Sequence, residues 1–449
     1  MSTTNPVRNP DTRSRPLMTK RAWWLVILNL FIPGSAQVLA GNRRAGRFAL
    51  GATMLLWALV VAVVVLYFVN RALLLTIFTN SIVLWVLVVV LAFYAVVWIV
   101  ATFDTLRLVR LVKVAPSARG FIAGLSVVAL AVTAGAAGYA AVSAVSAIGV
   151  LDTVFSGGEV AEPIDGRYNI LLLGGDAGPD RLGMRPDSIS VVSIDAETGS
   201  AVIFGIPRNM EQARFSEGSP LYGPFPNGYD CGNDCLVSFL YTYGQEHPEL
   251  YPDAEAQGSQ PGIEATRDAA EGILGMTLQY YVLIDMQGFA DLIDALGGIT
   301  IEVAERVPYG ANTFDDGSPA PPEGYIEAGT VRMSGYTALW YARSRFGTND
   351  YIRMARQRQV QEAMLRQFEP ANIVLKFQDV AAAGAQVVST DIPQSMLGHF
   401  VELGAKTREL PIEKLNFVPP EFDGVNPDFA YIQQRVDEAT APVTPPPSG

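Results

Sequence analysis

The stretch "DSISVVSIDAETGSAVIFGIPRN" (Asp187–Asn209) decides the fold of the larger part of this chain. Two apolar runs rich in Val and Ile flank the polar segment "AETGS", which predicts two neighbouring β-strands joined by a turn. A third run, "NILLLGGD" (Asn169–Asp176), precedes them and predicts a buried strand. Asp176 then lies at the end of one strand, Asp187 at the start of the next, and Arg208 at the exit of the third.

Predicted helices and strands alternate along the rest of residues 151–449. "QYYVLIDM" and "ITIEVAE" predict strands, and "QGFADLIDALGG" predicts a helix that ends at a glycine. Further helices are expected near Cys235–Gly244, at Ile263–Leu274 and over Ser334–Tyr341. Residues 306–328 are rich in Pro and Gly and predict an irregular excursion. This alternation predicts a layered α/β domain.

The first third of the chain is apolar. Thr53–Phe68, Ser81–Val100 and Phe121–Ile148 carry almost no charge and approach or exceed the roughly 20 residues that a membrane-crossing helix needs. An earlier run, Ala22–Ala40, is broken by Pro33-Gly34-Ser35. We expect the broken run to enter and leave the membrane on one side as a hairpin, and the three later runs to cross it.

Basic residues set the predicted topology. They gather before the broken run, directly after it, and between the last two apolar runs, and such loops stay in the cytoplasm. Residues 151–449 then lie outside, whereas a four-crossing alternative would place the basic N-terminus outside. The predicted parts are a cytoplasmic N-terminus (1–21), a membrane domain (22–150), a linker (151–167), an extracytoplasmic domain (168–435) and a disordered Pro-rich tail (436–449).

Charge is divided unevenly between the two parts. The formal net charge is −12, and residues 1–150 hold thirteen Lys/Arg against two acids. Nineteen basic and forty-two acidic residues remain for residues 151–449, a net charge of −23. A domain this acidic is a poor general binder of the phosphate backbone, so we expect a membrane partner and no nucleic-acid partner.

The two cysteines, Cys231 and Cys235, stand close together in "CGNDC". With only two histidines besides, they are too few for most zinc frameworks. Outside the cytosol this spacing favours a small disulfide that closes the loop. Two free thiols in a loop are the alternative.

One segment runs against the acidity of its domain. "YARSRFGTNDYIRMARQRQ" (Tyr341–Gln359) carries five arginines and a single acid, Asp350. In "RSR", Arg343 and Arg345 project to the same side if the backbone is extended. Guanidinium groups match phosphate oxygens, and several together suit a pyrophosphate. The segment therefore predicts an anion site.

A helix is expected to begin in this segment, capped by Asp350 or by the asparagine before it. Asp350, Arg353 and Gln357 then share one helix face, near an N-terminus that also favours an anion. Arg356 and Arg358 are expected to point elsewhere, as solvated or ion-paired residues.

Acidic residues at the strand ends complete the candidate site. Asp176 and Asp187 are two hard carboxylates beside the expected phosphate oxygens, which suits a Mg²⁺ (or Mn²⁺) ion. Arg185 and Arg208 add positive charge there. For any one of these residues an ordinary surface ion pair is the better interpretation, but the ensemble favours a site.

Four ordered blocks of sequence resemble the LytR–CpsA–Psr family of cell-wall enzymes. They run from about Tyr168 to Glu369 and read "LLLGGDAGPDRLGMRPDSISVVSID", "GIPRN", "LIDMQGFADLIDALGGITIEV" and "YARSRFGTNDYIRMARQRQV". The glycine-rich insertion with paired cysteines resembles the Gram-positive, actinobacterial branch. The resemblance implies an extracytoplasmic α/β/α sandwich that holds a polyprenyl pyrophosphate-linked glycopolymer, with its lipid tail in an apolar tunnel.

The resemblance also implies roles for single residues. Asp176 and Asp187 resemble the Mg²⁺ ligands, and Asp350 resembles the acid that positions or deprotonates the acceptor hydroxyl, with Arg343 and Arg345 beside it. The residues that resemble the pyrophosphate binders are Arg185, Arg208, Arg343, Arg345, Arg353 and Gln357. Two departures stand out: "AGPD" intervenes before Arg181, and Asn209 replaces an acid that often follows "IPR".

The activity that the resemblance implies is transfer of a glycan phosphate onto peptidoglycan, at the muramic acid 6-hydroxyl, with release of polyprenyl phosphate. Two alternatives stay open. A pyrophosphatase would use water in place of the sugar hydroxyl. A non-enzymatic lipid-binding sensor or regulator of the envelope would need the arginines but no metal, and the paired acids argue against it.

Overall fold

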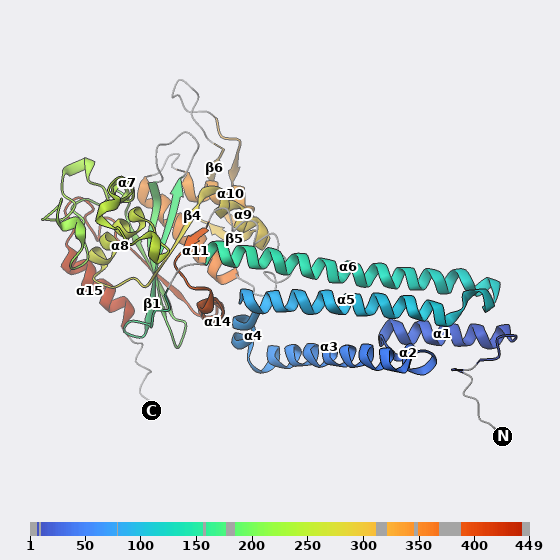
Figure 1. The fold of residues 1–449 in the computed structure, drawn as a ribbon. Coiled ribbons are helices and arrows are strands. Elements are labelled where there is room, and N and C mark those ends of the chain that lie inside the picture. Colours follow the sequence, from blue (N-terminus) through green and yellow to red (C-terminus); the bar gives the residue numbers. More distant parts are fainter. Residues whose placement is uncertain are drawn as a thin grey trace, which may run out of the picture. The chain divides into compact units, whose positions relative to one another are not determined.

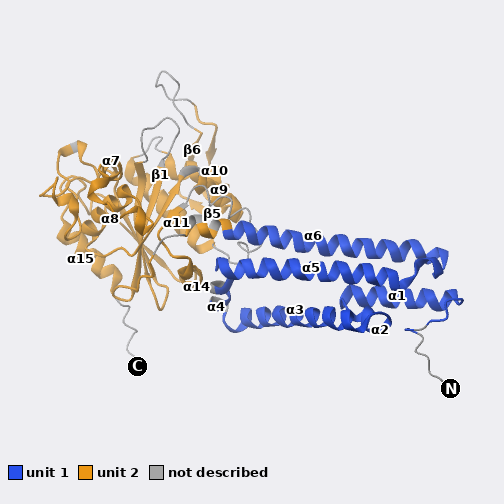
Figure 2. Cartoon of the chain, viewed as in Figure 1, with its two compact units in different colours: residues 1–148 blue, residues 149–449 orange. Residues whose placement is uncertain are grey.

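The computed structural model of this protein describes residues 7–8, 10–78, 80–155, 159–176, 185–310, 321–344, 349–367 and 388–441. The chain splits into two compact units, residues 1–148 and residues 149–449 (Figure 2). This division lies close to the boundary at residue 150 that the sequence predicts. The two units are described one after the other.

Unit 1 is built from helices (Figure 1). They are α1 (Arg15–Phe31), α2 (Ser35–Ala40), α3 (Arg43–Val69), α4 (Arg71–Phe78), α5 (Ser81–Val109), a 3-10 turn (Leu111–Lys113) and α6 (Pro116–Val154). Three stretches, Arg43–Val69, Ser81–Lys113 and Pro116–Gly149, are long and apolar enough to cross a membrane. They contain the three predicted runs, so unit 1 has the make-up of a membrane anchor.

The expected break in the first apolar run separates α1 from α2, which have 17 and 6 residues. Gly34 takes a φ of 96°, and a Cβ there would lie 2.5 Å from the Leu50 nitrogen on α3. Thr53 on α3 donates to the Pro33 carbonyl at 3.0 Å. The irregular backbone is thus enclosed and hydrogen-bonded by protein, as apolar surroundings require.

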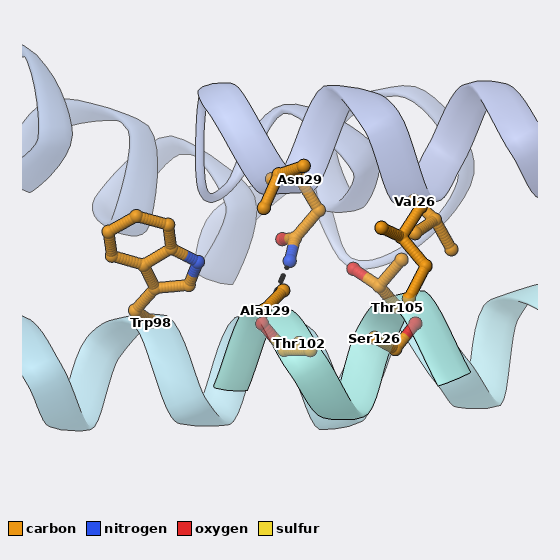
Figure 3. A pocket seen from close by; sticks show the side chains of 9 residues that line it. Val26, Asn29, Trp98, Thr102, Thr105, Ser126 and Ala129 are labelled. Carbon is orange, nitrogen blue, oxygen red and sulfur yellow. Dashed lines mark hydrogen bonds between the residues drawn. The ribbon is translucent and has the colours of Figure 1, made fainter. Parts of the chain in front are cut away.

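Hydrogen bonds hold this hairpin against α5, around a small cavity between α1, α5 and α6 (Figure 3). The Asn29 amide donates to Thr102 Oγ1 at 3.0 Å (Figure 3). Gln37 donates to the Ala101 carbonyl at 2.7 Å and to Thr105 Oγ1 at 2.9 Å. Such side-chain hydrogen bonds stabilise the association of helices in a membrane, where the hydrophobic effect does not drive helix packing.

Unit 2 is organised around a six-stranded mixed sheet (Figure 1). Its strands, in spatial order, are β10 (Ile412–Asn416), β3 (Ala201–Ile206), β2 (Arg185–Asp195), β1 (Arg167–Asp176), β4 (Tyr280–Asp285) and β9 (Val388–Thr390). β1 and β4 are parallel, as are β10 and β3, and β2 is antiparallel to both neighbours. The ends of β1, β3, β4 and β10 therefore meet the start of β2 at one edge, called here the carboxyl end.

Helices cover both faces of the sheet (Figure 1). One face packs on α7 (Leu240–Glu246), α8 (Pro261–Leu274) and α15 (Phe429–Thr440), and the other on α11 (Asp350–Gln367) and α14 (Leu397–Thr407). Alternate residues of β1 divide between the two cores: Leu171 and Leu173 face the first, Tyr168 and Ile170 the second. The predicted α/β/α sandwich is confirmed.

A smaller layer packs beside the sandwich. It consists of α9 (Met286–Leu296), α10 (Gly335–Arg343), the strand pair β5 (Ile299–Val303) and β8 (Gly329–Met333), and the pair β6 (Val307–Tyr309) and β7 (Gly324–Ile326). Val360 and Ala363 of α11 join its core, so α11 links this layer to the sheet. Short 3-10 helices lie at Pro220–Tyr222, Gly232–Asp234, Val237–Phe239, Pro248–Leu250, Glu255–Gln257 and Gln394–Met396.

Some predicted boundaries are wrong. The tail was expected from residue 436, but α15 continues to Thr440 because Phe429, Ile432 and Val436 form a buried stripe at helical spacing. Residues 442–449 lie outside the described part of the chain. At the other end α1 begins at Arg15, inside the expected N-terminal segment, and α6 reaches Val154, inside the expected linker.

Candidate functional site

Three segments bring charged side chains to the carboxyl end of the sheet. Asp187 lies near the start of β2, and Arg208 follows the end of β3. Asp350 opens α11. Of the two predicted caps for α11, Asn349 serves, because its Oδ1 accepts from the Ile352 amide at 2.9 Å.

Asp187, Arg208, Asp350 and Arg353 form one connected cluster, as expected from the sequence. Arg208 Nη1 donates to Asp187 Oδ1 at 2.6 Å, and Arg208 Nε to Asp350 Oδ2 at 3.4 Å. Arg353 Nη2 donates to Asp350 Oδ2 at 3.1 Å, and its Nη1 lies 4.0 Å from Asp187 Oδ1. Residues more than 140 positions apart in the chain thus share one network of charges, so Arg208 to Asp350 is a tertiary contact.

The burial of this cluster is unequal. The side chains of Arg208, Asp350 and Asp187 are 29%, 21% and 18% exposed, whereas that of Arg353 is 2% exposed. Nε of Arg353 is buried and has no hydrogen-bond partner among the described residues. Solvent therefore reaches the carboxylates and Arg208 from one side, while Arg353 is a fixed cation behind them.

Of the two roles predicted for Arg356 and Arg358, solvated or ion-paired, the first is wrong. Both are buried, at 5% and 1% exposure. Arg356 donates weakly to the Tyr341 carbonyl at 3.5 Å, and burial lowers its pKa. Burial, and next Arg353, lower the pKa of Arg358 to about 9. The sheet packs on one face of α11 and α10 packs on another. Side chains on both faces are therefore buried, whereas a helix that packs on one face only would expose half of them.

Three other predicted residues lie on elements that lead to or carry the cluster: Gln357 on α11, Arg343 on α10 and Arg185 on β2. Gln357 is buried, donates to the Ala342 carbonyl at 3.5 Å, and leaves its Oε1 without a described partner. Arg343 is exposed at the end of α10, 5.7 Å from the Trp340 ring. Arg185 opens β2 and lies 4.9 Å from the Phe239 ring.

Two predicted site residues, Arg345 and Asp176, have side chains outside the described part of the chain. Arg345 itself lies outside the described residues, as does Arg181, to which the sequence assigned no role. Asp176 ends β1 opposite Arg185, but its side chain is outside the description. Their roles stay predictions.

One carboxylate of the predicted metal site is described. Asp187 presents a partly exposed carboxylate at the start of β2, and the register places the backbone of Asp176 on the neighbouring strand end. Carboxylate oxygens are ligands that Mg²⁺ accepts, and the ion usually keeps several waters. Among the described side chains there is no group of three or more His, Cys, Asp or Glu that could hold a metal, and the magnesium site stays a prediction.

Cys231 and Cys235 are joined by a disulfide in the loop after Arg208. The backbone that follows it returns to the site: the Ser238 amide donates to the Arg208 carbonyl, and the Val237 amide to the Met210 carbonyl, both at 3.0 Å. The disulfide-closed loop thereby supports the segment that carries Arg208.

Sequence reasoning missed the polar layer beneath the cluster. Arg358 donates to Ser188 Oγ at 3.3 Å, and Gln361 donates to Ser190 Oγ at 3.1 Å. The two serines alternate with apolar residues on the strand face toward α11. The sequence signal that could have predicted this layer is the pair of polar residues at inward positions of the strand, together with a helix rich in Arg and Gln.

The model of the LytR_cpsA_psr family matches residues 152–440 of this chain. The chain belongs to the LytR_cpsA_psr family. The match covers all the described residues of the cluster and ends before the tail, and it leaves unit 1 outside. The family predicted from the four sequence blocks is therefore confirmed.

Curated relatives carry enzyme names. The chain is 26% identical over 232 residues to "Polyisoprenyl-teichoic acid--peptidoglycan teichoic acid transferase TagU" of Halalkalibacterium halodurans, which covers 50% of this chain and 61% of that protein. It is 25% identical over 239 residues to TagU of Bacillus mycoides, covering 53% and 63%. The chain thus spans about three fifths of the length of these relatives.

A solved structure resembles this chain more distantly. The crystal structure of B. subtilis TagV matches with a TM-score of 0.43 and 21% identity, and covers 62% of this chain and 98% of that one. The family assignment rests on the family model and not on this likeness. The actinobacterial branch stays a prediction.

Proposed function

We propose that this LytR_cpsA_psr protein is a membrane-anchored phosphotransferase that moves a glycopolymer from a polyprenyl pyrophosphate carrier onto peptidoglycan. The observation that carries the proposal is the charge of the site. Arg208 and Arg353 lie against the carboxylates of Asp187 and Asp350, and Arg358 is buried beside them with neutral hydrogen-bond partners in the described part of the chain. Burial of Arg353 and Arg358 makes this positive charge costly without an anion, and a pyrophosphate supplies one.

Each residue has a part in the proposed reaction. Arg208 and Arg353 bind the phosphate oxygens, joined by Arg185, Arg343, Arg345 and Gln357. Asp350 orients the acceptor hydroxyl, the muramic acid 6-hydroxyl, and takes its proton. The acceptor oxygen bonds to the glycan-linked phosphorus, the bridging P–O bond breaks, and polyprenyl phosphate leaves with the electron pair. Fixed charges that stabilise a transferring phosphoryl group are the main source of rate in such reactions.

Magnesium or manganese is part of this proposal. Asp176 and Asp187 would hold the ion. When bound, it neutralises charge on the phosphate oxygens. Arg208 Nη1 donates to Asp187 Oδ1 at 2.6 Å, so this carboxylate would face both the guanidinium and the ion.

Localisation follows from unit 1. The three candidate spans anchor the chain, and we propose that they cross the membrane with the basic loops in the cytoplasm and residues 149–449 outside. Polyprenyl carriers and peptidoglycan would then both be within reach of the same site.

The test uses the full chain in lipid nanodiscs with a polyprenyl pyrophosphate-linked glycan, peptidoglycan fragments and MgCl2. Mass spectrometry is expected to find a glycan phosphodiester on the fragment together with polyprenyl phosphate, and EDTA or Asp187→Asn is expected to abolish both. Release of free glycan phosphate with no coupled product would instead identify a pyrophosphatase. Binding of the lipid with no product of either kind would identify a sensor.

A further inference from the structure

Arg358 is the most deeply buried charge beside the site. It lies in the middle of α11 and is 1% exposed, on the face toward β2 and β3. Its Nη1 donates to Gln361 Oε1 at 2.5 Å and its Nη2 to Ser188 Oγ at 3.3 Å. A Cβ on Gly205 would lie 2.2 Å from Asn416 Oδ1 and 3.2 Å from Arg358 Nε, so the glycine of β3 leaves space for both side chains.

No carboxylate compensates Arg358 within the described part of the chain. Its hydrogen-bond partners there are an amide and a hydroxyl, both neutral, and its buried Nε has no described partner. Arg267, whose side chain is 17% exposed, differs in this respect: it pairs with Asp391 at 2.5 Å and Glu264 at 3.4 Å.

An uncompensated buried guanidinium destabilises the protein that contains it. Burial lowers the pKa of Arg358 to about 9, which reports how unfavourable its charged form is there. Such a group is kept where another state of the protein supplies the opposite charge. The nearest candidate is an anion at the cluster, because Ser188 follows Asp187 and Arg353 is the other charge that Arg358 senses.

We propose that Arg358 is a positioning residue of the phosphate site, holding the start of β2 through Ser188 and adding a buried positive charge that a diphosphate completes. The proposal rests on the proposed function. Arg358 is only 1% exposed and offers substrate almost no surface, so it acts through Ser188 and through its electrostatic field. The contribution of Arg358 to the binding free energy should grow with the negative charge of the ligand.

Four variants of the full chain in nanodiscs test this. Arg358→Met removes the charge and keeps the bulk, and Arg358→Lys keeps the charge. Arg366→Met is the control on the same helix, since Arg366 is 43% exposed and pairs with Glu362. Arg267→Met is the control for a buried arginine that has carboxylate partners. Calorimetry measures binding of inorganic pyrophosphate and inorganic phosphate with MgCl2, and thermal unfolding is followed without ligand.

Arg358→Met is expected to bind pyrophosphate roughly tenfold more weakly, to lose less affinity for phosphate, and to keep or raise its Tm. Arg358→Lys should recover most of the binding, and Arg366→Met should match the wild type. Arg267→Met should lower Tm, since it leaves two carboxylates unpaired in the interior.

Three outcomes would overturn the proposal. Wild-type pyrophosphate affinity in Arg358→Met shows that the charge is irrelevant. A fall in Tm like that of Arg267→Met, with equal losses for both anions, shows a purely structural role. If the wild type itself binds no pyrophosphate, the proposed function fails together with this inference, and that failure is visible before any variant is made.

Discussion

Asp350 is held between two arginines at the first turn of α11. Asp350→Asn keeps the size of the side chain but cannot take a proton from an acceptor hydroxyl. We expect kcat for glycan transfer to fall by roughly 10²–10⁴, with KM changed much less, because general base catalysis is worth about that factor. Steady-state kinetics with the lipid-linked glycan and peptidoglycan fragments measure the separate changes in kcat and KM.

A second helix supplies the control for this substitution. Asp428 caps α15 by accepting from the Tyr431 amide at 3.1 Å, and an asparagine caps equally well. Asp428→Asn should therefore leave both kcat and Tm at wild-type values. If Asp350→Asn also retains most of the wild-type kcat, Asp350 is not the base.

The site was partly predictable at the level of single residues. Asp187, Arg208, Asp350 and Arg353 were named from strand ends and helix spacing, and the structure brings them together. The burial of Arg358 was not predictable in the same way. It depends on Ser188 and on the missing side chain of Gly205, both about 150 or more positions away, and nothing in the local pattern of α11 encodes them.

At the scale of elements, α8 carries a half-buried charged face that has no part in the site. Glu264, Arg267, Asp268 and Glu271 follow each other at helical spacing. Asp268 accepts from Ser216 and Tyr251, and Glu271 from the Leu278 amide at 2.8 Å. This face fixes the surrounding loops to the sandwich core.

Glu271 makes the stability of unit 2 depend on pH. Burial is the largest cause that raises its pKa from 4.5 to about 7, so the folded state holds a proton that the unfolded state has lost in this window. Stability is then fully present below pH 4.5 and falls as pH rises toward 7, by about 3 kcal/mol. Glu271→Gln keeps the acceptor for Leu278 and should remove this loss.

Thermal unfolding between pH 4.5 and pH 8 measures the effect. Glu271→Gln should match the wild type at the acid end and have the higher Tm at the alkaline end. Glu255→Gln, at an exposed position, should follow the wild-type curve throughout. A wild-type curve that stays parallel to that of Glu271→Gln would show that Glu271 does not titrate in this range.

Elements were predictable where their periodicity is strong. The strands at Arg167–Asp176 and Ala201–Ile206 and the helix at Pro261–Leu274 match the apolar patterns that predicted them. The hairpin of β6 and β7 was missed because its strands have three residues each, too short for a pattern among prolines and glycines. Edge strand β10 carries Glu413 and Lys414, and only pairing with β3 identifies it as a strand.

At the scale of the whole molecule, the charge of the sequence divides as the two units do. Most basic residues of unit 1 lie around the start of α1, around the start of α3, and between the end of α5 and the start of α6, whereas forty-two of the forty-four acids lie in residues 151–449. Arg21 in α1 donates to the Leu108 carbonyl near the end of α5, so the first and third of these groups meet within unit 1. Such a distribution is typical of loops that remain in the cytoplasm.

The topology follows from this and is tested by single cysteines. The native pair is oxidised and does not react with maleimide. In intact cells an impermeant maleimide should label Ser81→Cys, at the start of α5, and should leave Thr12→Cys, Asn42→Cys and Lys113→Cys unlabelled until the membrane is opened. We expect this because α1 and α2 are each shorter than the roughly 20 residues of a crossing helix, so that they should return to the side they entered. Labelling of Thr12→Cys in intact cells, with Asn42→Cys protected, would mean that α1 and α2 cross together and that the chain has four crossings.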